Sequence, residues 1–331
     1  MTIVGCSSGD GSDVSATGTG TTGATSGSAG VTGASGSTSG SGGSAGASGG
    51  GSSGGGSTVG TGSGGSTGTG GNGGGGVDAG VSDSGAKTDA PHDVVAPDSP
   101  SKARQTARPI GMPYAKNGYW EYLPPGYGDG TGRPLLVFWH GVGEDGNGSA
   151  ADLAKVLAHG PAKLINLNQW PAARPFVVLS PQHGPSGCPT ATEIHDFITF
   201  AMGNYTVDSS RVYLTGLSCG ALGSWSYLGQ FQGQQVVAAA LIAGNASTAY
   251  NAAGCALLNQ VALWSFHGDA DQSVAISPDT AGMTNFMACP MPHKDAKYTI
   301  YPGVGHEGSW TMTYDLSAGN DIYTWMLAQH R

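Results

Sequence analysis

The chain has 331 residues, of which 60 are glycine, and its net charge is −9. The first 100 residues hold seven acidic residues and one lysine and so carry −6, which leaves −3 for the rest. No basic run or basic-aromatic patch occurs, so composition excludes the electrostatic footprint of a nucleic-acid-binding protein, and no apolar run has the length of a membrane span.

Residues 1–104 are predicted to be a disordered tether and linker. Residues 7–76 are almost entirely Gly, Ser, Thr and Ala, and residues 77–104 add Asp and Pro. Such a segment buries too little apolar surface to offset the conformational entropy lost on folding. The first Phe, Trp or Tyr is Tyr114, so the sequence predicts one globular domain over residues 105–331, which is long enough for a sizeable core.

Residues 3–6, Ile-Val-Gly-Cys, resemble a bacterial lipobox, in which the cysteine becomes lipid-modified and N-terminal. The polar tail after them is similar to the tethers of surface lipoproteins. Only five residues precede Cys6, so the charged and apolar regions of a signal peptide are missing. The resemblance implies a secreted or outer-membrane lipoprotein, lipidated at Cys6, with no other membrane contact. The alternative is that Cys6 has no role.

In the domain, apolar runs of strand length alternate with helical patterns. Strands are expected at residues 119–123, 134–139, 176–179, 211–214, 236–242, 261–266 and 298–301, with a turn at 208–210. Helices are expected around the stripe 153–157, after the Thr190–Glu193 capping box, at 221–228, near 279–287 and near 320–329. This alternation predicts an α/β fold, a doubly wound, mostly parallel sheet with helices on both faces.

Residues 216–220 read Gly-Leu-Ser-Cys-Gly and stand between an expected strand and an expected helix. That is the context of a nucleophile elbow, in which a sharp turn exposes one serine hydroxyl above the sheet. The flanking glycines leave room for a strained backbone. Because the chain is rich in Gly and Ser, the pattern alone is weak evidence, so the case for Ser218 as a nucleophile depends on its partners.

Candidate partners of Ser218 follow two later strands, where ligands bind in such a sheet. The loop at 267–274 contains Asp269 and Asp271, and the loop at 303–310 contains His306. The order Ser218, Asp271, His306 is that of α/β-hydrolases. Asp269 is the alternative acid. His140 and His267 are expected to be structural residues that bond loops at strand ends.

The glycine-rich residues 140–146 follow the expected strand at 134–139 and could bring backbone N–H groups close to a ligand. Gly141, Gly143 and Gly146 have the spacing of a dinucleotide-binding loop. No acidic ribose partner clearly ends a following strand, so a nucleotide site is the weaker interpretation.

These motifs resemble the α/β-hydrolase superfamily. Within it, the chain looks like the secreted esterases that include polyhydroxybutyrate depolymerase-like, feruloyl and acetylxylan esterases, and like their "predicted peptidase" relatives. The resemblance covers residues 119–331 and rests on residues 140–143, 211–220, 267–274 and 303–306.

The resemblance implies a role for each site residue. Ser218 would be the nucleophile, His306 the general base and Asp271 the acid that orients the imidazole. The backbone N–H groups of Val142 and Cys219 would form the oxyanion hole. Gly143 and Trp310 are expected to bind substrate, although Trp310 could equally cap a helix.

Three function classes follow. The first is a serine ester hydrolase acting on an extracellular polyester or plant cell-wall ester, small or polymeric. The second is a serine peptidase of the same fold, which the lack of a second large domain disfavours. The third is a non-catalytic surface lipoprotein, which the intact motifs disfavour. No Cys-x-x-Cys or His-Glu-x-x-His occurs, so no metal or other cofactor is expected, and we expect a monomer.

Four cysteines lie in the domain: Cys188, Cys219, Cys255 and Cys289. An even number in an exported domain suggests one or two disulfides. Three full pairings are possible and the sequence does not choose among them; free buried thiols are the alternative. A bond between Cys188 and Cys219 would hold the oxyanion position directly.

Overall fold

The computed structural model describes residues 105–111 and 116–331. The predicted tether at 1–104 and the predicted lipidation of Cys6 lie outside these residues. Eight strands form one sheet, and they span Gln105–Arg108 (β1), Tyr119–Tyr122 (β2), Arg133–Trp139 (β3), Val177–Pro181 (β4), Val207–Leu217 (β5), Ala238–Ile242 (β6), Ala262–Gly268 (β7) and Ala296–Tyr301 (β8).

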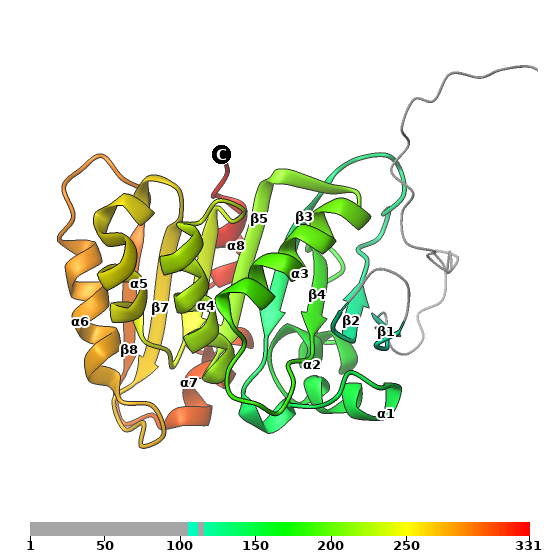
Figure 1. Ribbon diagram of the computed structural model, residues 1–331, viewed down its shortest axis with the longest axis horizontal. Coiled ribbons are helices and arrows are strands. Elements are labelled where there is room, and N and C mark those ends of the chain that lie inside the picture. The colour runs from blue at the N-terminus through cyan, green and yellow to red at the C-terminus, as the bar shows by residue number, and fades with distance from the viewer. Residues whose placement is uncertain (1–104, 112–115) are drawn as a thin grey trace, which may run out of the picture. The chain divides into compact units, whose positions relative to one another are not determined.

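The strand order is β1-β2-β4-β3-β5-β6-β7-β8 (Figure 1). The pairs β1–β2 and β2–β4 are antiparallel, and every other pair is parallel. The carboxyl ends of β3, β5, β7 and β8 therefore meet at one edge of the sheet. The predicted doubly wound, mostly parallel α/β fold is confirmed.

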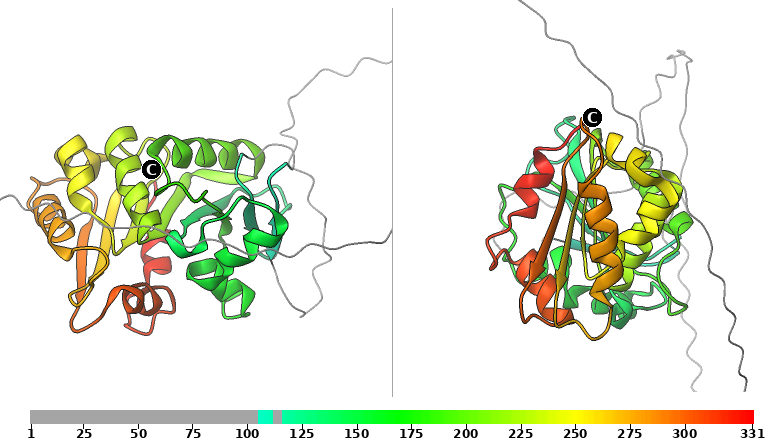
Figure 2. Two further views of the ribbon diagram at one scale, coloured as in Figure 1. Left: turned by 60° about the horizontal axis from the view of Figure 1, so that its bottom comes forward. Right: turned by 90° about the vertical axis from the view of Figure 1, so that its left-hand side faces the viewer.

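Helices cover both faces of the sheet (Figure 2). The helical segments are η1 (Val142–Glu144), α1 (Ala150–Leu153), η2 (Ala154–Ala158), α2 (Gly160–Asn166), α3 (Ala191–Asn204), α4 (Cys219–Phe231), α5 (Ala246–Ala253), η3 (Gly254–Asn259), α6 (Ile276–Met287), α7 (His306–Tyr314) and α8 (Ile322–Leu327). One core joins the sheet to α3, α4, α5 and α6, and the other joins it to α2, α7 and α8.

Successive side chains of a strand point to opposite faces, which is why the central strands read as unbroken apolar runs. In β3, Leu135, Val137 and Trp139 belong to the first core, whereas Leu136 and Phe138 belong to the second. All five are fully buried.

Several elements differ from the sequence-based expectation. β1 was not expected, because most of its residues are polar. It forms by pairing with β2, on which Glu121 makes a buried ion pair with Arg108 at 2.8 Å. α5 and α7 were not expected either. The expected turn at 208–210 lies inside β5, and the stripe at 153–157 is divided between short segments that end before Gly160, where φ is +64°.

Candidate active site

Ser218 occupies the sharp turn between β5 and α4. Its backbone has φ 51° and ψ −119°, a strained conformation for a residue with a side chain. Close approach of the flanking backbone explains the glycines: a Cβ on Gly220 would lie 2.2 Å from the carbonyl oxygen of Trp139, and one on Gly216 would lie 2.8 Å from the carbonyl carbon of Gly220. The local geometry is that of a nucleophile elbow.

Three side chains from different strand ends meet at this turn. His306 Nε2 lies 2.9 Å from Ser218 Oγ, and His306 Nδ1 lies 2.6 Å from Asp271 Oδ2. The ionised Asp271 carboxylate can only accept, so Nδ1 carries the proton and Nε2 is free to accept the serine proton. His306 is the first residue of α7, and Asp271 lies in the loop after β7.

The Asp271 carboxylate is fully buried and well supplied with donors. Its Oδ1 accepts the backbone N–H groups of Ser273 at 2.8 Å and Val274 at 3.0 Å. Burial opposes ionisation, but these hydrogen bonds and the one from His306 hold the pKa of Asp271 below its ordinary value. The alternative acid, Asp269, accepts the N–H of Gly303 at 2.6 Å instead.

A second histidine–aspartate pair lies behind Asp271. His267 Nε2 is 3.3 Å from Asp271 Oδ2 and 3.1 Å from the carbonyl oxygen of Val274, and its Nδ1 is 3.1 Å from Asp279 Oδ2. Burial works against protonation, yet the bond and charge of Asp279 raise the pKa of His267. His267 does bond a loop, as expected, but it also joins Asp271 to a buried carboxylate at the start of α6.

The loop after β3 brings backbone N–H groups beside Ser218. The N–H groups of Val142 and Cys219 donate to no acceptor in the described part of the chain, and each begins a helical segment. Val142 is exposed, and a side chain on Gly143 would meet nothing within 4 Å. Backbone N–H groups without an internal acceptor are what an oxyanion hole requires, and the role of these two stays a prediction.

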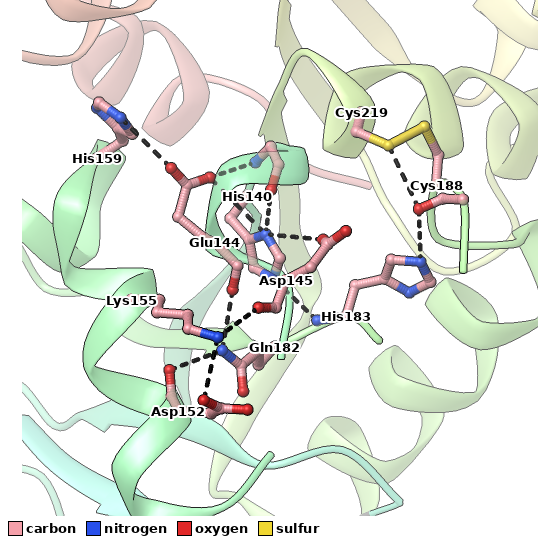
Figure 3. A network of polar contacts seen from close by, with 12 residues as sticks. His140, Glu144, Asp145, Asp152, Lys155, His159, Gln182, His183, Cys188 and Cys219 are labelled. Carbon is pink, nitrogen blue, oxygen red and sulfur yellow. Dashed lines mark hydrogen bonds and ion pairs between the residues drawn. A yellow bond between two sulfur atoms is a disulfide. The ribbon is translucent and has the colours of Figure 1, made fainter. Parts of the chain in front are cut away.

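Buried polar side chains hold this loop from below (Figure 3). The Nε2 of Gln182 donates to the carbonyl oxygens of Glu144 at 2.9 Å and Asp152 at 2.8 Å. His140 Nε2 accepts the N–H of His183 at 2.8 Å, and its Nδ1 faces the carbonyl oxygen of Gly141 at 2.6 Å. His140 is therefore neutral, and burial lowers its pKa to about 4. The expected structural role of His140 agrees with these contacts.

Two disulfides are formed, Cys188–Cys219 and Cys255–Cys289. The first ties the residue after Ser218 to the loop that follows β4, beside the network in Figure 3. The pairing that the sequence left open is thereby settled, and the alternative of free thiols is wrong for these four cysteines.

Trp310 lies on α7, one helical turn after His306. Its indole is 7% exposed and packs edge-on against the His306 ring, with centroids 4.7 Å apart, while its Nε1 donates to His159 Nδ1 at 3.3 Å. Besides these two contacts, Trp310 belongs to the second hydrophobic core. Substrate binding by Trp310 and Gly143 stays a prediction.

The geometry also contains residues that sequence reasoning missed. Glu144 stands in the glycine-rich loop but had no expected partner, and Asp279 was seen only as a helix residue. Their partners lie on other elements: His159 for Glu144, and His267 for Asp279. A buried acid in a strand-end loop was the only available signal.

In the described residues, no group of three or more His, Cys, Asp or Glu side chains could hold a metal ion, and no helix could cross a membrane.

No family model and no curated protein sequence matches this chain. Solved structures do. A thermostable esterase is 21% identical with a TM-score of 0.51, and the match covers 69% of this chain and 64%, less than two thirds, of that esterase. A mutant of the feruloyl esterase module from Clostridium thermocellum, complexed with sinapinate, is 16% identical with a TM-score of 0.50, covering 68% of this chain and 87% of the module. At such identities the likeness establishes the fold alone: this chain has the α/β-hydrolase fold.

Proposed function

We propose that this α/β-hydrolase-fold protein is a serine carboxylic-ester hydrolase. The observation that carries the proposal is the hydrogen-bonded series from Ser218 Oγ through His306 to Asp271, 2.9 Å and 2.6 Å long, at a strained strand-to-helix turn. A structural serine has no need of positive φ, a histidine with a free Nε2 and a buried carboxylate behind it. That combination favours nucleophilic catalysis.

In the proposed mechanism, Ser218 Oγ attacks the carbonyl carbon of the ester, and His306 Nε2 takes the hydroxyl proton. The carbonyl oxygen becomes an oxyanion that accepts hydrogen bonds from the N–H groups of Val142 and Cys219. His306 then gives its proton to the leaving alkoxide, and the alcohol departs. Asp271 keeps the imidazole oriented and stabilises its cationic form.

The product of this half-reaction is an ester between the acyl group and Ser218. Water repeats the sequence: His306 takes a water proton, hydroxide adds to the acyl carbon, and Ser218 leaves with the proton from His306. Every proton transfer uses one nitrogen, Nε2, so the tautomer set by Asp271 serves both halves of the reaction.

We propose extracellular polyesters or plant cell-wall esters as the substrate class. Polyesters and plant cell-wall esters are suggested by the sequence resemblance, and the feruloyl esterase module shares the fold. Two disulfides support a protein that works in an oxidising compartment, where such substrates occur. A panel of feruloyl, acetyl-xylan and short polyhydroxyalkanoate esters would rank the candidates.

Labelling with a fluorophosphonate tests the proposal, because the reagent phosphonylates only an activated serine. Wild type should be labelled, Ser218→Ala should not, and His306→Ala should be labelled far more slowly. A folded wild-type protein that resists the reagent would contradict the hydrolase assignment. Turnover of p-nitrophenyl acetate compared with a peptide anilide then separates an esterase from a peptidase of the same fold.

A further inference from the structure

Glu144 belongs to the glycine-rich loop at residues 140–146, and its carboxyl group is buried, since the residue is 5% exposed. Its Oε2 accepts the backbone N–H of Gly141 at 2.8 Å. A Cβ on Gly141 would lie 3.3 Å from Glu144 Oε2 and 3.5 Å from Ser218 Cβ. A single backbone residue thus separates this carboxylate from the serine, and Gly141 sits one position before the proposed donor Val142.

The other carboxylate oxygen faces a histidine on a different element (Figure 3). Oε1 of Glu144 lies 3.4 Å from Nε2 of His159, the residue before α2. His159 Nδ1 accepts the indole N–H of Trp310 at 3.3 Å. Because an accepting nitrogen carries no proton, the His159 proton sits on Nε2, the nitrogen that lies 3.4 Å from Glu144 Oε1.

The series ends at the triad histidine, since Trp310 packs edge-on against His306 at a ring-centroid distance of 4.7 Å. It runs from the backbone of Gly141 through Glu144, His159 and Trp310 to the imidazole of His306. We propose that Glu144 is a positioning residue for the oxyanion loop, setting the loop against His306 through His159 and Trp310. This inference rests on the proposed function, because it assigns the N–H of Val142 to an oxyanion hole.

An ionised carboxylate suits this position better than a neutral side chain. One of its oxygens accepts from the Gly141 N–H while the other faces the protonated Nε2 of His159, whereas a glutamine would turn an N–H₂ toward one of these two groups. A carboxylate is expensive to bury, and burial raises the pKa of Glu144 to about 7.

The charged and titratable groups around Glu144 do little to offset this burial. His140 Nδ1 lies 3.9 Å away but stays neutral, and burial lowers the pKa of His159. The negative charges of Asp145 and Glu307 raise the pKa of Glu144 further. Ionising Glu144 therefore lowers the stability of the folded protein. A buried acid with this cost indicates a role in the site.

The test compares wild type with Glu144→Gln and with Asp145→Asn, a matched control on the same loop whose carboxylate binds no N–H of the series. For p-nitrophenyl acetate at pH 8, Glu144→Gln should lower kcat about tenfold and leave KM within about twofold, because the oxyanion hole acts on the transition state. Asp145→Asn should stay within about twofold of wild type in kcat.

Thermal unfolding adds a readout that is independent of activity. The folded-state pKa of Glu144 is raised, so its favourable contribution is present below its unfolded pKa and is lost as pH rises through about 7. The melting temperature of Glu144→Gln relative to wild type should therefore rise between pH 5 and pH 8.

Unaltered kcat in a folded Glu144→Gln variant of an active wild type would overturn the inference. If that variant does not fold, Trp310→Phe keeps an aromatic side chain beside His306 and removes the indole N–H that His159 accepts. It should also lower kcat at constant KM, and wild-type kcat there would again overturn the inference. An inactive wild type would instead count against the proposed function itself.

Discussion

The two disulfides offer a matched pair of perturbations. Cys188–Cys219 closes a sequence separation of 31 residues, and Cys255–Cys289 closes one of 34. The double variants Cys188→Ala/Cys219→Ala and Cys255→Ala/Cys289→Ala should therefore lose almost the same stability. From the loop-closure entropy of the unfolded chain, each loss is about 4 kcal/mol, and the two differ by about 0.1 kcal/mol.

Their effects on catalysis should differ, because the bonds lie at different ends of the sheet. Cys219 follows Ser218 and carries a proposed oxyanion donor. Helices α5 and α6 follow the carboxyl ends of β6 and β7 and run back toward the opposite edge of the sheet. Cys255 lies in η3, just after α5, and Cys289 lies just after α6. Lys294, just after this bond, donates to the carbonyl oxygen of Leu258 near the start of β7.

Loss of one oxyanion donor typically lowers kcat by a factor of about 10²–10³. Loosening the Cys219 backbone without removing its N–H should cost less, and we expect about a tenfold decrease in kcat for the Cys188/Cys219 variant. The Cys255/Cys289 variant should keep kcat within about twofold of wild type, because its bond lies away from the reacting groups.

The assay is turnover of p-nitrophenyl acetate at a temperature where circular dichroism shows both variants folded. Urea unfolding gives the two free energies, and thiol titration of denatured wild type verifies that all four cysteines are paired. Equal losses of kcat in both variants would refute the reasoning, since stability alone would then explain the effect. So would full activity in the Cys188/Cys219 variant.

Three other predictions concern stability. His140 is buried and neutral, and its pKa is lowered to about 4, so its contribution to stability is present above its unfolded pKa and is lost as pH falls toward 4. Urea unfolding should show that the free energy of unfolding decreases by up to about 3 kcal/mol between pH 7 and pH 4. The decrease should be smaller in His140→Gln. Gly220→Ala should lose about 1–3 kcal/mol in thermal unfolding, because the new Cβ meets the Trp139 carbonyl oxygen, whereas Gly203→Ala in α3 meets open space and should gain up to about 1 kcal/mol. Asp279→Asn breaks the buried pair with His267 Nδ1, while Asp271 stays 3.3 Å from Nε2, and should lose about 3–5 kcal/mol; a loss below about 1 kcal/mol would contradict the importance of the buried pair.

Sequence reasoning found the central strands because their burial on both faces leaves unbroken apolar runs. It proposed Ser218, Asp271 and His306, whose side chains the structure brings into contact, because each follows a strand and the carboxyl ends of parallel strands lie at one edge of the sheet. Strongly apolar runs of strand length, such as residues 134–139, were also correctly predicted to be strands and not helices.

The remaining features depend on contacts between distant segments. β1 is a strand because it pairs with β2, and Arg108 is tolerated there because it forms a buried ion pair with Glu121, two residues along β2 from its register partner Tyr119. Glu144 acquires its environment from His159 and Trp310, and the latter is more than 150 residues away along the chain. The cysteine pairing likewise needed the positions of two loops, since all three pairings were compatible with the sequence.

The central claim is that Ser218 carries the acyl group during turnover. Wild-type protein turning over p-nitrophenyl acetate should be quenched in acid within the first turnovers, digested and mapped by mass spectrometry. We predict an acetyl group on the peptide that contains Ser218 in wild type, and none on that peptide in Ser218→Ala. Acetylation of a different residue, with Ser218→Ala as active as wild type, would contradict the account.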